Sequence, residues 1–310
     1  MTGRVLRSTG SHYQVMDTDD NIHDARLRGR LKLKGSRLTN PVAVGDEVSC
    51  SKDEDGYVWI ESIFPRKNHI IRRSTNLSKD AHIIAANIDQ LLLVSTIRSP
   101  QTSMGFVNRL LVTAEAYHIP SILIINKIDL LNQEDEMLLE EWKATYQGAG
   151  YQVLTICAET VNLSVLEGLM KDKVTLLSGH SGVGKSTLVN RIQPDLELRT
   201  AEVSKAYDKG KHTTTFATMH PLEIGGFIVD TPGIKGFGIV DIPREELSHY
   251  FPEMRELLHD CKFNDCRHID EPGCAVKAAL EKGLIAESRY LSYLSMYEGD
   301  DGSFRKDIYA

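Results

Sequence analysis

The fold of this chain is decided by the stretch Gly179-His180-Ser181-Gly182-Val183-Gly184-Lys185-Ser186, which matches the pattern G-x-x-x-x-G-K-S. The β-prone run Val174-Thr175-Leu176-Leu177 precedes it, and Thr187-Leu188-Val189-Asn190 can form the first turn of a helix. A strand, a glycine-rich loop and a helix in this order predict a phosphate loop, because glycines let successive backbone N–H groups point at one phosphate. The alternative is a glycine-rich turn without a ligand.

Two side chains of this loop carry its expected chemistry. Lys185 would reach the β- and γ-phosphates of a nucleotide, and the Ser186 hydroxyl would ligate Mg²⁺. The residues predicted to surround the phosphates are Gly179, Ser181, Gly182, Val183, Gly184, Lys185, Ser186 and Thr187.

Length and composition predict an ordinary globular protein of two or three domains. The chain has 310 residues, of which 41% are hydrophobic and 25% charged. Its longest apolar runs are strand-sized, and residues 1–7 lack an apolar signal region, so we expect a cytoplasmic protein without a membrane span. A formal net charge of −7 argues against coating by nucleic acid, although an acidic total can hide a local basic face.

A second nucleotide-binding motif, Asn126-Lys127-Ile128-Asp129, follows the apolar run at residues 121–125. Open α/β sheets bind ligands at the carboxyl ends of their strands. There Asp129 could accept both N–H bonds from the N1 and N2 edge of guanine, while Asn126 braces the loop and Lys127 lies over the base or ribose. Taken alone, the tetrapeptide could also be a helix start with an aspartate cap.

The segment Cys157-Ala158-Glu159 ends another expected strand. Guanine-nucleotide proteins often have S-A-x here, and the alanine N–H meets guanine O6. Cys157 replaces the serine, so the match is partial, and a plain strand end explains these three residues nearly as well.

Two segments after the phosphate loop have the composition of switch elements. The first is Lys209-Gly210-Lys211-His212-Thr213-Thr214-Thr215. Among its three adjacent threonines, Thr214 is the preferred candidate for sensing the γ-phosphate through Mg²⁺. The second is Asp230-Thr231-Pro232-Gly233, in which Asp230 would hold the Mg²⁺ shell and the Gly233 N–H would contact the γ-phosphate.

The position after the second switch motif is Ile234, and an aliphatic side chain cannot orient the attacking water. We therefore expect slow intrinsic hydrolysis and place the catalytic role on His212, with Lys185 and Thr214 supporting the phosphates. An exposed loop histidine without a role is the alternative for His212.

The order of these motifs predicts a circular permutation. The base-reading segments at 126–129 and 157–159 precede the phosphate loop, and the switch segments follow it. The same sheet can form if the original termini are joined and new ones are opened, which is tolerated where chain ends lie close together.

The first sixty or so residues predict a small five-stranded barrel with a basic face. Within residues 25–34, Arg26, Arg28, Arg30, Lys32 and Lys34 alternate with apolar residues or glycine. Alternate residues of a strand share a face, so five cations would line up, and a polyphosphate backbone could cover them. The alternative is a solvated face balanced by Asp17, Asp19, Asp20 and Asp24. Residues 65–80 are expected to form a basic linker or ordered loop.

A metal site is predicted near residue 270. The predicted ligands are three cysteines and one histidine: Cys261, Cys266, His268 and Cys274. Four protein ligands leave no open coordination position, which is typical of a structural zinc site. His259 is an alternative fourth ligand, and free core cysteines are the alternative to any metal. Helices are expected at 244–250, 253–260, 276–282 and 287–297.

With these motifs in this order, the chain closely resembles the bacterial ribosome small subunit-dependent GTPase A family. The resemblance covers nearly the whole chain: the barrel, the G-x-S-G-V-G-K-S loop, H-T-T-T, D-T-P-G and C-x4-C-x-H-x5-C. It implies an oligonucleotide-binding barrel (1–65) that binds RNA, a circularly permuted α/β GTPase domain (66–240) and a helical zinc domain (241–310).

The same resemblance implies a function. The protein would bind GTP and GDP with Mg²⁺, carry one zinc ion on Cys261, Cys266, His268 and Cys274, and hydrolyse GTP with stimulation by the small ribosomal subunit and its rRNA during late maturation of that subunit. We expect a monomer. Two other functions fit some of the motifs: an ATPase or nucleotide kinase, and an RNA-binding scaffold that holds nucleotide without turnover.

Overall fold

The computed structural model describes residues 1–28, 41–73, 81–194, 196, 217–230 and 242–299. The chain separates into two compact units. One contains Met1–Leu91, Asn162–Leu177 and Ile192–Ile234, and the other contains Leu92–Val161, Ser178–Arg191 and Lys235–Ala310.

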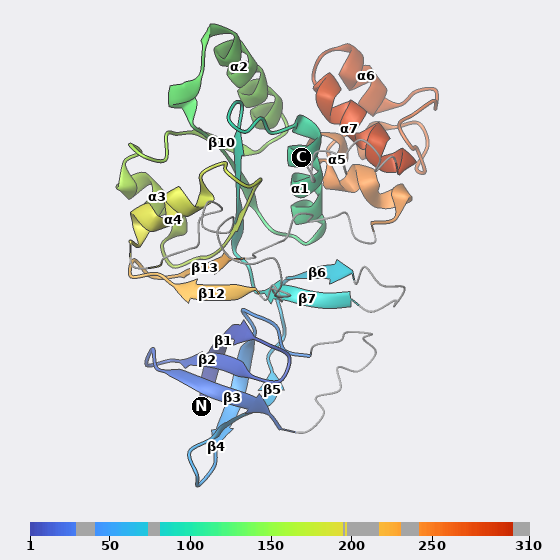
Figure 1. Ribbon diagram of the computed structural model, residues 1–310. Coiled ribbons are helices and arrows are strands. Elements are labelled where there is room, and N and C mark those ends of the chain that lie inside the picture. Colours follow the sequence, from blue (N-terminus) through green and yellow to red (C-terminus); the bar gives the residue numbers. More distant parts are fainter. Residues whose placement is uncertain (29–40, 74–80, 195, 197–216, 231–241, 300–310) are drawn as a thin grey trace, which may run out of the picture. The chain divides into compact units, whose positions relative to one another are not determined.

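The first unit begins with a barrel of five strands, drawn in blue in Figure 1. They are β1 (Thr2–Ser8), β2 (Tyr13–Asp17), β3 (Ile22–Leu27), β4 (Glu47–Lys52) and β5 (Val58–Ile63). The sheet closes because β1 pairs with both β2 and β4, and β3 pairs in parallel with β5. Alternate side chains point inward and form one apolar core, which includes Val5, Tyr13, Val15, Val48 and Ile60.

The basic row of the barrel is only partly described. Arg26 and Arg28 are exposed and alternate with the less exposed Ala25 and Leu27, but β3 ends at Leu27. Arg28 forms an ion pair with Glu61 of β5 at 2.8 Å. Arg28 is therefore balanced by an acid on β5, not by one of the acids of residues 17–24. Arg30, Lys32 and Lys34 lie outside the described residues.

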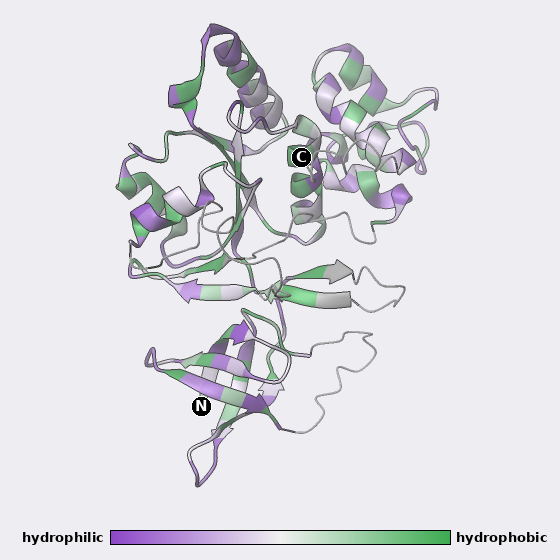
Figure 2. Cartoon of the chain, in the orientation of Figure 1, coloured by the Kyte–Doolittle hydropathy of each residue, from purple (hydrophilic) through white to green (hydrophobic). Residues whose placement is uncertain are grey.

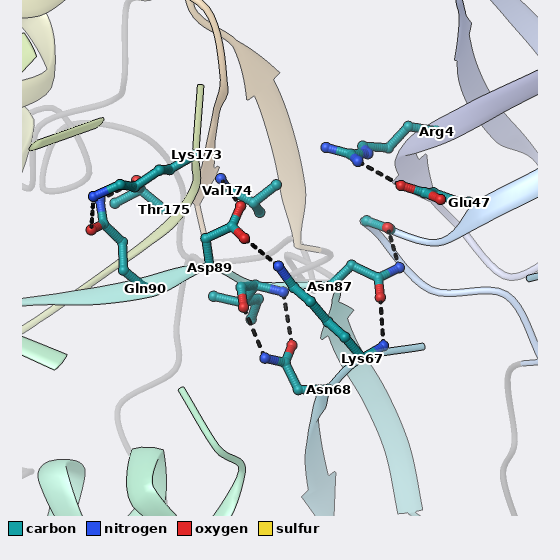
Figure 3. A network of polar contacts seen from close by, with 12 residues as sticks. Arg4, Glu47, Lys67, Asn68, Asn87, Asp89, Gln90, Lys173, Val174 and Thr175 are labelled. Atoms are coloured by element: carbon teal, nitrogen blue, oxygen red, sulfur yellow. Dashed lines mark hydrogen bonds and ion pairs between the residues drawn. The ribbon is translucent and has the colours of Figure 1, made fainter. Parts of the chain in front are cut away.

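The prediction of a linker at residues 65–80 was wrong in part. β6 (His69–Arg73) pairs antiparallel with β7 (Ala81–Ala86), because the β-branched pair Ile70 and Ile71 favours a strand. Polar contacts hold the start of this hairpin, as Figure 3 shows: Lys67 pairs with Asp89, and the Asn68 side chain exchanges two hydrogen bonds with the backbone of Ile88 at 2.8 Å each.

Three further strands and one helix among the described residues belong to the first unit. β13 (Phe227–Asp230) lies parallel to β11 (Val174–Ser178) and antiparallel to β12 (Thr218–Pro221). Thr218 of β12 also pairs with Arg7 of β1, so the barrel continues the sheet that β13 belongs to. α3 (Leu163–Met170) precedes β11.

The second unit contains a parallel sheet with helices. β8 (Gln90–Thr96), which starts in the first unit, is buried at every position, as expected for a strand covered on both faces. β9 (Ser121–Asn126) pairs in parallel with β10 (Gln152–Thr155).

The second unit also contains the helices α1 (Met104–Ala116), α2 (Gln133–Gly148) and α4 (Lys185–Ile192). The Ser103 side chain caps α1, and Asn132 with Asp135 forms a capping box on α2. α2 is coloured largely hydrophilic in Figure 2, and its buried residues are Trp142, Thr145 and Tyr146.

The C-terminal region is a compact helical cluster. It contains the 3₁₀ helices η3 (Arg244–Tyr250) and η4 (Leu258–Asp260) and the helices α5 (Pro252–Arg255), α6 (Ala275–Glu281) and α7 (Glu287–Glu298). Its core includes Phe251, Met254 and Tyr293, packed with Val112 of α1. The single helix expected at 253–260 was wrong: the chain breaks between Arg255 and Leu258, just before the first cysteine of the predicted metal site.

Candidate functional site

The phosphate loop lies between β11 and α4, as the sequence predicts. Gly184 has φ +100°, and a Cβ there would stand 2.2 Å from Nδ2 of Asn126, while a Cβ on Gly179 would stand 2.1 Å from the carbonyl oxygen of Val94. No side chain fits at either position, so the glycines allow the loop to pass close to two neighbouring segments. Lys185 donates from Nζ to the carbonyls of Gly179 at 2.8 Å and His180 at 2.6 Å. Its ammonium is therefore held against the loop.

Asn126 joins the phosphate loop to the second nucleotide motif. It is the last residue of β9 and only 2% exposed. Its Nδ2 donates to the carbonyl of Val183, and its Oδ1 accepts from the N–H of Ala158, both at 2.8 Å. One buried amide thus connects three segments that are far apart in sequence.

Lys127 and Asp129 lie on the loop after β9. Lys127 has φ 62° and donates from Nζ to the carbonyl of Ser99 at 2.6 Å. Asp129 lies in the short 3₁₀ helix η1 (Ile128–Leu130) and is exposed; no described residue donates to its carboxylate. That carboxylate can accept hydrogen bonds from a ligand.

Residues 157–161 form one hydrogen-bonded turn. The carbonyl of Cys157 accepts from the N–H groups of Thr160 at 3.1 Å and Val161 at 2.8 Å. The N–H of Ala158, which the sequence assigns to guanine O6, already donates to Asn126. Within the described residues no acceptor faces the N–H of Glu159, which is the next donor of the turn.

Two contacts of the loop region have no motif that would reveal them in the sequence. The His180 ring stacks on Phe106 of α1, with ring centroids 3.7 Å apart and planes 24° apart. Arg191, near the end of α4, donates to the carbonyls of Ala158 and Val161. The only signal for Arg191 is a basic residue in the last turn of a helix.

The predicted switch and magnesium residues are only partly described. His212, Thr214 and Gly233 lie outside the described residues, as does Ile234. β13 ends at Asp230, and Ser186 and Thr187 lie half-buried in the first turn of α4.

The four predicted metal ligands lie together. One donor atom from each of Cys261, Cys266, His268 and Cys274 falls within 4.8 Å of all the others. His268 faces the sulfurs of Cys274 at 3.4 Å and Cys261 at 3.6 Å through Nδ1. The alternative ligand His259 is not part of this cluster.

The environment of the cluster suits a cation. Burial raises the pKa of the Cys266 thiol to about 12 and lowers the pKa of His268, so without a cation the thiol stays protonated at neutral pH. A soft divalent ion would stabilise thiolates there, and three sulfurs with one imidazole match the ligand set of structural zinc. Two tyrosines brace this segment: Tyr290 donates to the carbonyl of His268 and Tyr293 to that of Arg267, each at 2.6 Å.

Among the described helices, none combines the length and apolar character that a membrane span requires.

A phosphate loop preceded in sequence by its N-K-x-D partner, and tied to it by one amide, defines the class of circularly permuted phosphate-loop GTPases. Family models for the RsgA GTPase and the RsgA N-terminal domain match residues 63–240 and 2–60. The chain belongs to the RsgA GTPase family, which confirms the predictions of the family, the GTP hydrolase class and the architecture.

Relatives of known name and structure agree with this assignment. The chain is 50% identical to the Small ribosomal subunit biogenesis GTPase RsgA of Flavobacterium psychrophilum, over 100% of this chain and 96% of the relative. It is 48% identical to the protein of the same name from Bacteroides fragilis, over 98% and 99%. The crystal structure of YjeQ from Thermotoga maritima matches with a TM-score of 0.80 and 36% identity, over 97% and 98% of the two chains. A structure described as YloQ, a circularly permuted GTPase, matches with a TM-score of 0.75 and 30% identity, over 96% and 94%.

Proposed function

We propose that this chain binds the small ribosomal subunit and acts in its late maturation, hydrolysing GTP to GDP and phosphate with stimulation by the subunit. The observation that carries the nucleotide part is the double hydrogen bond of Asn126, which joins the phosphate loop to the base-reading segments. The ribosomal part rests on the names of the relatives.

The nucleotide would lie along the second unit's loops. The phosphate loop residues 179–187 would surround the phosphates, and Asp129 would accept from the guanine N1 and N2 edge. Lys127 would cover the base or ribose. Because the N–H of Ala158 is engaged by Asn126, we assign guanine O6 to the 157–161 turn as a whole, with the N–H of Glu159 as the available donor. Ser186, Thr214 and Asp230 would hold Mg²⁺, which supplies positive charge against the phosphates when bound.

His212 is proposed as the group that orients the attacking water, since Ile234 cannot do so. Subunit-stimulated turnover by His212→Ala should then fall well below the wild-type rate. Equal rates at saturating subunit concentration would remove His212 from the mechanism.

A nucleotide-dependent switch follows from the same arrangement. GTP would order the segments around Thr214 and Gly233 and favour binding to the subunit, and hydrolysis would release the protein. Subunit affinity measured with a non-hydrolysable GTP analogue should exceed the affinity measured with GDP. Equal affinities would exclude the switch.

The remaining assignments are a zinc ion on the three cysteines and His268, rRNA contact by the basic face of the barrel, a monomeric state and a cytoplasmic location. The domain boundaries at 65 and 240 also remain predictions. The four zinc ligands are spread over the segment between η4 and α6, so a zinc ion bound to them would cross-link that segment.

One assay separates this function from an RNA-binding scaffold. GTP turnover is measured with and without purified small subunits. We expect slow turnover alone and a large acceleration by subunits, whereas a scaffold would give no turnover in either case.

A second measurement excludes an ATPase or nucleotide kinase. Asp129→Asn should weaken binding of guanine nucleotides and improve binding of xanthine nucleotides, because the carboxylate is the group that reads N1 and N2. An unchanged preference would contradict the guanine assignment.

A further inference from the structure

Arg191 is a charged side chain near the nucleotide loops that the proposed mechanism does not use. It lies in the last turn of α4, the helix that starts at Lys185 of the phosphate loop. The residue is half-buried, and its guanidinium donates to two carbonyls of the 157–161 turn: Nη1 to Ala158 at 3.3 Å and Nη2 to Val161 at 3.1 Å.

These two carbonyls suit a guanidinium. Within the turn only the Cys157 carbonyl accepts from the turn's own N–H groups, so the carbonyls of Ala158 and Val161 are available to a donor from outside the turn. The planar fork of arginine presents several N–H donors in fixed directions, so it can bridge two carbonyls at once. Lysine has one mobile ammonium and cannot reproduce that geometry.

The 157–161 turn is thus held at both ends. Asn126 accepts from its N–H at Ala158, and Arg191 donates to its carbonyls. Both supports lead back to the phosphate loop. Asn126 donates to Val183, and Arg191 is six residues beyond Lys185 on the same helix, about 9 Å along its axis.

We propose that Arg191 is a positioning residue for guanine recognition: it fixes the 157–161 turn to the phosphate-loop helix, so that the turn meets position 6 of the base while the loop holds the phosphates. This inference rests on the proposed GTP site. It predicts that the reading of position 6 depends on Arg191 and that the reading of N2 by Asp129 does not, because Asp129 lies on the separate loop after β9.

Two analogues separate these readings. Inosine triphosphate lacks the 2-amino group that Asp129 reads, and 6-thioguanosine triphosphate replaces O6 with sulfur, a weak acceptor. Affinities for GTP and both analogues are measured on the full chain as wild type, Arg191→Gln and Arg191→Lys. Arg244→Gln is the matched control, since Arg244 also donates to a backbone carbonyl, that of Glu298 at 3.5 Å.

In Arg191→Gln we expect the preference for GTP over the thio analogue to fall about fivefold, the size of one net hydrogen bond, while the preference for GTP over inosine triphosphate stays constant. Arg191→Lys should fall between glutamine and wild type, and Arg244→Gln should equal wild type.

Other results would contradict either the positioning role or the GTP site. An equal loss of affinity for all three nucleotides, or no loss, overturns the positioning role, because a merely structural arginine moves no ratio. A wild-type protein that binds the thio analogue as tightly as GTP also overturns it. A wild-type protein that binds none of the three refutes the proposed GTP site itself.

Discussion

At the scale of single residues, the side-chain amide of Asn126 joins three segments of the proposed nucleotide site. Replacing it with alanine removes the partners of the Val183 carbonyl and the Ala158 N–H, both on buried residues. Each unpaired buried group costs about 1–3 kcal/mol, so the unbraced segments should relax in the free protein. Nucleotide binding must then restore their arrangement, and we expect the affinity to fall at least about tenfold.

The measurement is GDP binding by calorimetry. Asn162→Ala is the matched control, because Asn162 caps α3 and its loss should cost stability, about 1 kcal/mol, rather than nucleotide affinity. Unchanged GDP affinity in Asn126→Ala would contradict the bracing role.

A pH dependence is expected from the barrel. A hydrogen bond from His23 lowers the pKa of Asp17 to about 2, with help from the N–H groups of Asn21 and Asp19. A carboxyl whose pKa is lower in the folded state stabilises the fold above its unfolded pKa of about 4, and that contribution is lost as the pH falls toward 2. In Asp17→Asn, the free energy of unfolding should therefore fall less steeply than in wild type as the pH decreases from about 4 to 2. Urea titration at each pH measures this free energy. A fall as steep as in wild type would exclude Asp17 as its source.

The residue scale also defines what the sequence could predict of the site. Motif chemistry predicted Asn126, Asp129 and Lys185, because each has a fixed place relative to a glycine loop or a strand end. Arg191 and the stack of Phe106 on His180 depend on where a helix flank meets a loop, and no local pattern encodes such a meeting.

At the scale of elements, one buried ion pair holds three helices together. Arg289 of α7 is fully buried and forms a bidentate pair with Glu253 of α5 at 2.6 and 3.0 Å. It also donates to Oδ1 of Asn108 on α1 at 3.0 Å, and Phe251 lies 4.7 Å from its guanidinium.

Breaking this pair from one side should be costly. Arg289→Met leaves Glu253 buried and unpaired, and we expect it to lower the free energy of unfolding by about 3–5 kcal/mol. The double variant Arg289→Met, Glu253→Leu should recover much of that loss, because no charge remains buried. Denaturant unfolding measures both, and a double variant no more stable than the single one would contradict this account.

Elements with strong patterns were predicted well. The apolar runs at 121–125 and 174–177 correspond to β9 and β11, and the helices expected at 276–282 and 287–297 correspond to α6 and α7, each within one residue at either end. β6 was missed because its arginines and the polar residues after it gave the segment the composition of a loop. The helix expected at 253–260 was too long, since α5 ends at Arg255 and only the short 3₁₀ helix η4 follows at Leu258–Asp260.

At the scale of the whole molecule, removal of the metal should affect the stability of a whole region of the chain. The ligand cluster lies between η4 and α6, so removal of zinc should destabilise the helical cluster from residue 244 to 298. We expect metal analysis to give one zinc ion per chain, and a chelator to lower the midpoint of thermal unfolding.

Cys274→Ser should lose the zinc, while Cys157→Ser should retain it, since Cys157 lies outside the ligand cluster. A metal-free protein with an unchanged midpoint would show that the cysteines serve packing alone.

The covering of α1 has a consequence for how the protein is made. Val112 and Asn108 on α1 contact residues that lie far downstream in the sequence. Arg289, for example, follows Asn108 by 181 positions. During translation the face of α1 toward these partners stays uncovered until residues 247–293 have left the ribosome. A chain interrupted before that point exposes apolar surface and is prone to aggregate or to be held by chaperones, although its nucleotide loops are already complete.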